Sequence, residues 1–331
     1  MAMEMTTVAG ATCGDPEGGD SSSTVLSDSA RTTNSRQQKP RKCGNCGEAG
    51  HTARTCQKEK GPVVIKLEYT EMVKRGDLVV LWDLETTAKN ANVAEPVDIY
   101  YMAMKVDCNE NKGLDFLKRD DGIFESLIRP TNGQSTSFLR EHGITDEMLE
   151  SSDSLASVVD RADDAIRRFA ASAAEPNSTV RVWLVGHNAN SYDNTVMFSS
   201  LQRQGGRGWC ERLESCGVIG FIDTLSMLGG DFCALKGQGV NGRNGKKLTS
   251  IHAIVTGKSL VGAHRAKADV EGLGRILMES ASMKECFFTK KVGLPIKTWA
   301  LRNQQMIARN AWKAARDAGN SSKESLSESA P

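Results

Sequence analysis

Apolar residues form short runs and helical spacings along the middle of the chain. Five stretches have the length and content of β-strands: 77–85, 96–106, 122–129, 181–187 and 218–224. Elsewhere apolar residues recur at helical spacing, which predicts helices at 154–172, 192–204, 247–256 and 266–283. A strand meander followed by strand–helix alternation predicts an α/β fold, with a mixed five-stranded sheet flanked by helices.

The first apolar run ends in a pair of carboxylates. Leu78 to Trp82 are all apolar, as in a buried central strand, and Asp83 and Glu85 follow directly. Because side chains alternate along a strand, both carboxylates project from one face, with Leu84 opposite. An exposed acidic turn is the alternative, but the apolar run before the pair favours a site at the end of a buried strand.

Two further carboxylates lie on helix faces that are otherwise apolar. Asp193 shares its predicted face with Val196, Met197 and Leu201, and Asp269 shares its face with Leu273, Ile276 and Leu277. A carboxylate on an apolar face is costly unless it is paired or bound to a metal. Capping of the helix is the alternative role for Asp193. His264 lies five residues before Asp269, about 140° away around an ideal helix, which places it in the preceding turn.

Three segments carry a family resemblance: LVVLWDLETT, VGHNANSYDNTVMF and AHRAKADVEGLGRIL. They resemble the Exo I, Exo II and Exo III motifs of the DEDDh family of 3′→5′ exonucleases. The resemblance covers residues 76–282 and extends to HGIT at 142–145 and IDTLSML at 222–228. The stretch 248–269 is similar to the segment that leads into Exo III in TREX-type exonucleases. The sequence departs from the family at 87–89, where Thr-Ala-Lys replaces a common Thr-Gly pair that bears on how the terminal sugar is held.

The resemblance implies an RNase H-like exonuclease fold and a metal-dependent hydrolase that releases nucleoside 5′-monophosphates from nucleic-acid 3′ ends. Two Mg²⁺ or Mn²⁺ ions would stabilise the charge on the phosphodiester, and such hard cations prefer oxygen ligands. The implied ligands are Asp83, Glu85, Asp193 and Asp269. Histidine accepts protons near neutral pH, so the implied general base is His264. The implied substrate contacts are Thr86, His187 and Asn188.

A second motif precedes this region. CGNCGEAGHTARTC has the C-x2-C-x4-H-x4-C spacing of a CCHC zinc knuckle, which predicts one structural Zn²⁺ with the ligands Cys43, Cys46, His51 and Cys56. A segment this short folds only with its metal. Nearby lysines and arginines suit phosphate contacts, whereas Gly44 and Ala53 stand where a larger, stacking residue is common. We therefore expect weak, sequence-tolerant and salt-sensitive binding to single strands.

Composition indicates the remaining parts of the 331 residues. The net charge is +1, yet residues 1–30 hold five acidic residues and no lysine or arginine, among many Gly, Ser and Thr, which is typical of disorder. The predicted organisation is a disordered segment 1–38, a knuckle 39–60, a linker 61–75, an exonuclease domain 76–283, a basic helical extension 284–317 and a disordered tail 318–331.

Two basic segments leave alternatives open. The loop 234–247 carries four basic residues among glycines, and the resemblance places it near the substrate cleft, but a solvated insertion has the same composition. Residues 297–317 have the pattern of a helix that either packs on the core or extends the binding surface.

Nine cysteines without a disulfide framework, together with a zinc–thiolate motif, favour a reducing, intracellular compartment such as the nucleus or cytosol. No secretory signal or membrane-length apolar run is present, so we expect neither secretion nor a membrane partner, and protein partners are not indicated. The expected partner is nucleic acid with a single-stranded or frayed 3′ end, with DNA favoured over RNA.

Two other functions fit part of the sequence. A catalytically silent single-stranded nucleic-acid-binding protein would use the same fold and knuckle, but all four carboxylates and the histidine are present. A retroelement-derived integrase or ribonuclease H has another carboxylate spacing and lacks the H-x4-D pattern.

Overall fold

The structure is a computed structural model, and it describes residues 43, 62–109, 113–131, 137–176, 178–229, 235, 237–240 and 242–327. The chain divides into two compact units, Met1–Lys60 and Gly61–Pro331. Of the predicted zinc ligands only Cys43, which is buried, is among the described residues. Cys46, His51 and Cys56 lie outside them, as does the predicted disordered segment 1–38. The knuckle therefore stays a prediction.

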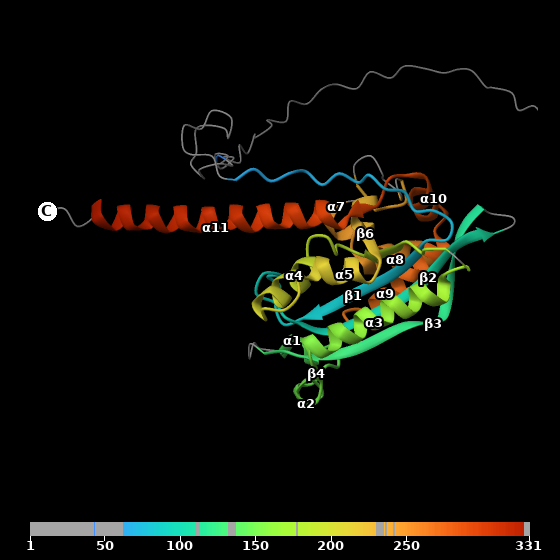
Figure 1. Ribbon diagram of the computed structural model, residues 1–331. Coiled ribbons are helices and arrows are strands. Elements are labelled where there is room, and N and C mark those ends of the chain that lie inside the picture. Colours follow the sequence, from blue (N-terminus) through green and yellow to red (C-terminus); the bar gives the residue numbers. More distant parts are fainter. Residues whose placement is uncertain are drawn as a thin grey trace, which may run out of the picture. The chain divides into compact units, whose positions relative to one another are not determined.

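One sheet runs through the second unit in the order β4-β3-β2-β1-β5-β6-β7. Its long strands β1, β2 and β3 lie side by side in Figure 1. The strands are β1 (Leu78–Thr86), β2 (Pro96–Asn109), β3 (Gly113–Arg129), β4 (Asp153–Ser154), β5 (Val182–Gly186), β6 (Val218–Asp223) and β7 (Leu294–Pro295). The first three strands pair antiparallel, whereas β5 runs parallel to β1 and β6 runs parallel to β5. The five longer strands confirm the predicted RNase H-like arrangement. The sheet has seven strands rather than five, because β4 and β7 add two residues each at its edges, too few to leave a pattern in the sequence.

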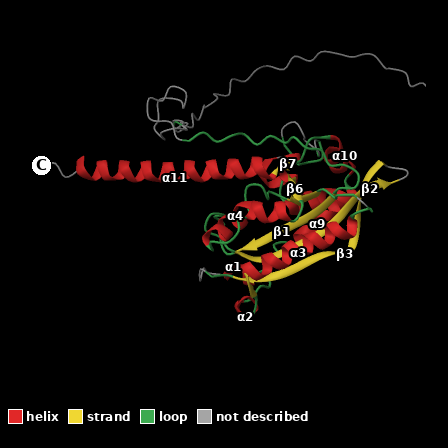
Figure 2. Cartoon of the chain, in the orientation of Figure 1, coloured by secondary structure: helices red, strands yellow, loops and turns green. Residues whose placement is uncertain are grey.

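Eleven helices are described, shown in red in Figure 2. They are α1 (Ser137–Arg140), α2 (Asp146–Glu150), α3 (Leu155–Ala173), α4 (Asp193–Arg203), α5 (Trp209–Ser215), α6 (Thr224–Met227), α7 (Gly242–Gly245), α8 (Leu248–Thr256), α9 (Ala266–Glu279), α10 (Ala281–Thr289) and α11 (Ile296–Ser327). The predicted helix 266–283 is two helices. Ser280 is extended, and its hydroxyl accepts a hydrogen bond of 3.2 Å from the backbone N–H of Met283, so it ends α9 and caps α10.

Apolar side chains cover both faces of the sheet, as the unbroken apolar run of β1 predicts. On one face Leu78, Val80 and Trp82 belong to a cluster that includes α3 and α4. On the other face Val79 and Leu81 belong to a cluster that includes α9. Because β1 is buried on both sides, its carboxyl end, which carries the two carboxylates, has a fixed position and orientation.

The carboxyl-terminal helix is longer than predicted. The first turns of α11 pack on the core, where Trp299 is 1% exposed and donates a hydrogen bond of 2.9 Å to the carbonyl of Asn190. The helix then continues to Ser327, into the range 318–331 that was predicted to be a disordered tail. No proline interrupts it, since the next one is Pro331. Within the described ranges, no helix has the length and apolar content that a membrane span requires.

Candidate active site

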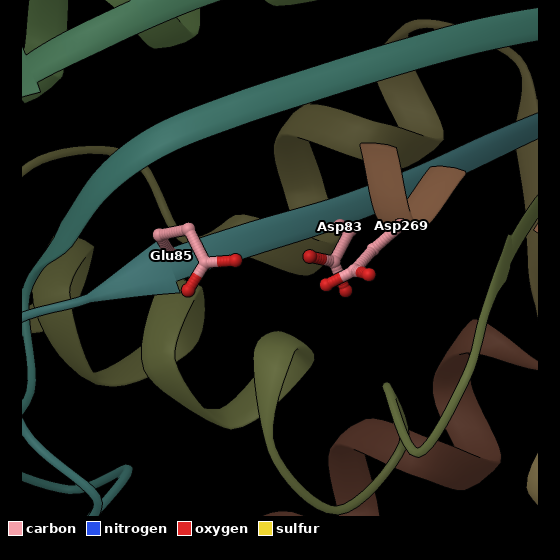
Figure 3. A group of neighbouring side chains, drawn as sticks. All are labelled: Asp83, Glu85 and Asp269. Atoms are coloured by element: carbon pink, nitrogen blue, oxygen red, sulfur yellow. The ribbon is translucent and has the colours of Figure 1, made fainter. Parts of the chain in front are cut away.

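Three carboxylates converge at the carboxyl end of β1. Asp83 and Glu85 lie on this strand, and Asp269 lies in the first turn of α9. One carboxylate oxygen of each residue lies within 4.8 Å of those of the other two. In Figure 3 the side chains extend from their two elements toward a common space. The structure thus brings together residues that are far apart in the sequence.

The strand geometry explains this convergence. Leu84 is 5% exposed and belongs to the cluster on the opposite face, so Asp83 and Glu85 share the α9 face, as predicted. The pairing of β1 with β5 extends only to Leu81 opposite Val185, whereas the pairing with β2 continues to the end of β1. The end of β1 therefore has a strand on one side only, which leaves room for a site beside the carboxylates.

Asp193 faces the same space from α4. It is 5% exposed and is the first residue of the helix, while the N-cap position is occupied by Tyr192. The alternative that Asp193 caps its helix is therefore wrong. It lies outside the group of three that meet within 4.8 Å. A cavity of about 770 Å³ is nevertheless lined by all five predicted catalytic residues, Asp83, Glu85, Asp193, His264 and Asp269.

Burial raises the pKa of all four carboxyls, and repulsion from neighbouring carboxylates adds to this for Asp83, Glu85 and Asp193. Burial is the largest cause in each case. It raises the pKa of Glu85 to about 8, with further increases from the charges of Asp269, Asp98 and Asp193. The pKa of Asp193 rises to about 7, although backbone hydrogen bonds oppose the increase. The pKa of Asp83 lies well above its ordinary value, and that of Asp269 is also raised.

This donor set fits divalent cations. Among the described residues, no lysine or arginine forms an ion pair with any of the four carboxylates. Clustered oxygen donors that repel one another are the ligands that Mg²⁺ and Mn²⁺ prefer, because a bound cation compensates their charge.

His264 lies in the turn before α9, as predicted, since the helix has Arg265 as its N-cap. Its φ of 69° is in the left-handed region, which costs a residue other than glycine about 1 kcal/mol or more. Two contacts hold this conformation. The backbone N–H of His264 donates a hydrogen bond of 3.1 Å to Asp269 Oδ2, and Arg265 Nε lies 3.1 Å from Oδ2 of buried Asp98. The exposed imidazole is thus presented at the edge of the cavity.

The three predicted substrate contacts differ in their placement. Thr86 is 6% exposed, its hydroxyl lies 2.6 Å from that of Tyr192, and it does not line the cavity. His187 lines the cavity, but both of its ring nitrogens contact the protein: Nε2 lies 2.9 Å from the carbonyl of Lys246, and Nδ1 lies 3.0 Å from Thr224 Oγ1. Because a carbonyl only accepts hydrogen bonds, Nε2 carries the proton.

Burial lowers the pKa of His187, which favours the neutral ring. Asn188 also lines the cavity, with a φ of 67°. Its backbone N–H donates a hydrogen bond of 2.8 Å to Asp223 Oδ1.

Several residues of the site were not predicted. Asp223 is 4% exposed and accepts backbone hydrogen bonds from Asn188, Asn190 and Leu225, and burial raises its pKa to about 6. Asp223 could have been predicted from its position at the end of the apolar run of β6. By contrast, Lys246 and Lys247 belong to the basic loop 234–247, which the resemblance placed near the substrate cleft, and both line the cavity. The Asp98–Arg265 pair left no signal, because it joins residues that are distant in the chain.

No family model matches the chain, and no curated protein matches it. Similar solved structures include a 3′-exonuclease described for its 3′-end-specific recognition of the histone mRNA stem-loop, which is 15% identical with a TM-score of 0.46 over 65% of this chain and 68% of that one. A full-length 3′-exonuclease is 16% identical, with a TM-score of 0.45 over 63% of this chain and 62% of that one.

Exonuclease I of E. coli, solved with a dT13 oligonucleotide, is 15% identical with a TM-score of 0.43 over 63% of this chain. The match spans 41% of the length of exonuclease I. Similarity at this level does not identify a function, which depends on the residues of the site.

Proposed function

We propose that this protein is a metal-dependent 3′→5′ exonuclease of the DEDDh type. The observation that carries the proposal is the meeting of Asp83, Glu85 and Asp269 within 4.8 Å, in a cavity that Asp193 and His264 also line. Four carboxylates can hold two cations for hydrolysis of a phosphodiester, and a histidine can accept the proton of the attacking water. Their order along the chain matches the three motifs of the sequence resemblance.

The residues divide the chemistry between them. Asp83, Glu85, Asp193 and Asp269 would hold Mg²⁺ or Mn²⁺ ions, which supply charge neutralisation and a more acidic water molecule when bound. The neutral imidazole of His264 accepts the proton of the attacking water. Because His264 is exposed, that proton passes on to solvent. The water oxygen bonds to phosphorus, the phosphorus–oxygen bond to the leaving 3′-oxygen breaks, and that oxygen takes up a proton from solvent. A nucleoside 5′-monophosphate is released.

The cavity supports a terminal nucleotide as the substrate. Its volume of about 770 Å³ lies in the range of pockets that enclose small ligands. His187 and Asn188 shape its wall, while Thr86 acts behind the wall through Tyr192. Lys246 and Lys247 line the same cavity and suit a phosphate. We favour single-stranded or frayed DNA 3′ ends over RNA, on the TREX-type resemblance of residues 248–269.

One cleavage experiment tests this function. Full-length protein is incubated with 5′-labelled DNA and RNA oligomers, single- and double-stranded, with Mg²⁺, with Mn²⁺ or with EDTA, and Asp269→Asn serves as the inactive control. The proposal predicts a ladder that shortens from the 3′ end, is stronger on DNA, and disappears in EDTA. Binding of the oligomers without any cleavage would instead identify the catalytically silent binding protein.

The zinc knuckle, as proposed, tethers the strand and takes no part in catalysis. Deletion of residues 1–60, the unit that ends at Lys60, should leave kcat on saturating short oligomers unchanged. It should weaken binding to long single strands and flatten the salt dependence of that binding, because phosphate-neutralising cations are lost. The measurement compares binding at low and moderate salt, with zinc content as a control. Loss of turnover at saturating substrate would make the knuckle part of the catalytic unit.

A further inference from the structure

A second histidine stands beside His264. The imidazole rings of His142 and His264 have centroids 4.9 Å apart and planes inclined by 50°. His142 is half-buried and His264 is exposed. Both imidazoles lie near enough to the Asp269 carboxylate to influence its pKa. The proposed reaction gives His142 no chemical step, so its place at the site calls for another explanation.

The turn that carries His142 is fixed by apolar anchors on both sides. The backbone N–H groups of His142 and Ile144 both donate to the carbonyl of Leu139, at 3.0 and 3.1 Å. Leu139 and Ile144 are fully buried in a small cluster with Val97 of β2. Gly143 supplies the left-handed residue of the turn, with a φ of 77°. His142 is therefore presented by a rigid support attached to the sheet.

The side chain of His264 is supported less than its backbone. Its backbone is held by Asp269 and by the neighbouring Arg265–Asp98 pair. In the part of the chain that the structure describes, no hydrogen bond reaches its imidazole. General bases are commonly oriented by a hydrogen bond from a third group. Here the ring of His142 lies where such a third group would lie, and it packs against the imidazole of His264.

We infer that His142 is a positioning residue that orients the imidazole of His264 by ring packing. The inference rests on the proposed function of His264 as general base. A base must stand within hydrogen-bond reach of the proton that it accepts, so loss of the packed ring allows His264 to adopt orientations that miss the water. The packing needs a flat ring at position 142 and does not need its nitrogen atoms.

The kinetic test uses His142→Ala, His142→Phe and the neighbouring exposed control Glu141→Ala in the full-length protein. Misplacement of a reacting group by about 1 Å costs up to ~10²-fold in rate, so His142→Ala should lower kcat by between about 10-fold and 10²-fold with little change in KM. His142→Phe should retain most of the activity, and Glu141→Ala all of it. In a His264→Ala background, His142→Ala should cause no further loss.

Three results would overturn the inference: wild-type kcat in His142→Ala, a loss in His142→Phe as large as that in His142→Ala, or additive losses in the double variant. If the wild-type protein itself fails to cleave with Mg²⁺ or Mn²⁺, the proposed function fails instead. The two failures are thereby distinguished.

A second readout does not depend on activity. The chain has five histidines, so their ring protons can be resolved by NMR and assigned with His264→Ala. His142→Ala should shift the His264 ring signals, because the ring-current effect of the His142 imidazole is removed. The melting temperature should stay near that of the wild type. Unchanged His264 signals would show that the rings do not pack in solution and would contradict the inference.

Discussion

Both ends of strand β1 place acidic side chains beside a cavity, but the two groups differ in their partners. Directly before β1, Asp77 is 3% exposed and next to a cavity of about 460 Å³. Its carboxylate accepts hydrogen bonds of 2.7 and 2.9 Å from the Arg181 guanidinium and of 2.9 Å from Trp183 Nε1. At the other end, Asp83 and Glu85 meet a third carboxylate.

The difference separates a structural acid from a candidate catalytic one. A buried charge is tolerated when the protein supplies a partner, as Arg181 does for Asp77, or when a ligand supplies it. The carboxyl end of β1 concentrates like charges, which a bound external cation would relieve. Asp77 should therefore matter for stability, and Asp83 for activity.

The largest effect is expected at the carboxyl end. Asp83→Asn should abolish Mg²⁺-dependent cleavage, because a metal ligand is lost while the fold survives. Removing one of four mutually repelling carboxylates should leave the melting temperature of the metal-free protein equal or higher. Oligomer cleavage and thermal unfolding of the same preparation check both statements. Near-normal turnover would exclude Asp83 as a ligand.

His264→Ala should lower kcat by about 10²- to 10⁴-fold, the contribution of general acid–base catalysis, with metal binding retained. The exposed residue Lys258, in the same loop, provides the matched control Lys258→Ala, which should be fully active. Single-turnover cleavage with saturating Mg²⁺ measures the chemical step. An unchanged rate in His264→Ala would mean that another group activates the water.

Asp77→Asn should show the opposite behaviour. Loss of the charge that faces Arg181 should reduce the free energy of unfolding by about 3 kcal/mol, as for other broken buried pairs. Cleavage at a temperature where the variant is folded should match the wild type. Urea unfolding and oligomer cleavage are measured side by side. A catalytic defect in the folded variant would contradict the assignment of a structural role to Asp77.

A smaller effect concerns pH. Folding raises the pKa of Glu85 to about 8 and that of Asp193 to about 7, so the folded state binds more protons than the unfolded state. Their contribution is fully present below the ordinary carboxyl pKa of about 4 and is lost as pH rises toward 8. The metal-free protein should therefore become less stable over this range. Melting temperatures with and without Mg²⁺, with Glu85→Gln as control, test this. A wild-type slope equal to that of Glu85→Gln would contradict the assignment.

Much of this arrangement was predictable from local patterns. The apolar run before Asp83 indicated a buried central strand, and the helical spacing around Asp193 and Asp269 placed both on inward faces. His264 was placed in the turn before its helix. These features depend on residues within a few positions of one another, where strand and helix periodicity determine direction.

What escaped prediction depends on contacts between distant segments. The burial of Thr86 arises from Tyr192, and the support of the His264 turn arises from Asp98 and His142. The edge strands β4 and β7 are defined by their neighbours rather than by their own two residues. No periodicity within a segment carries such information.

The most direct test of the central claim is a Mn²⁺ titration followed by electron paramagnetic resonance. Zinc-loaded, full-length wild-type protein, Asp83→Asn and Asp77→Asn are compared with a non-cleavable single-stranded oligomer bound, at a temperature where circular dichroism shows all three to be folded. The account predicts that the wild type and Asp77→Asn take up Mn²⁺ alike, whereas Asp83→Asn loses this uptake. Equal uptake by Asp83→Asn and the wild type, or no uptake by any of them, would contradict a cation site at the carboxyl end of β1.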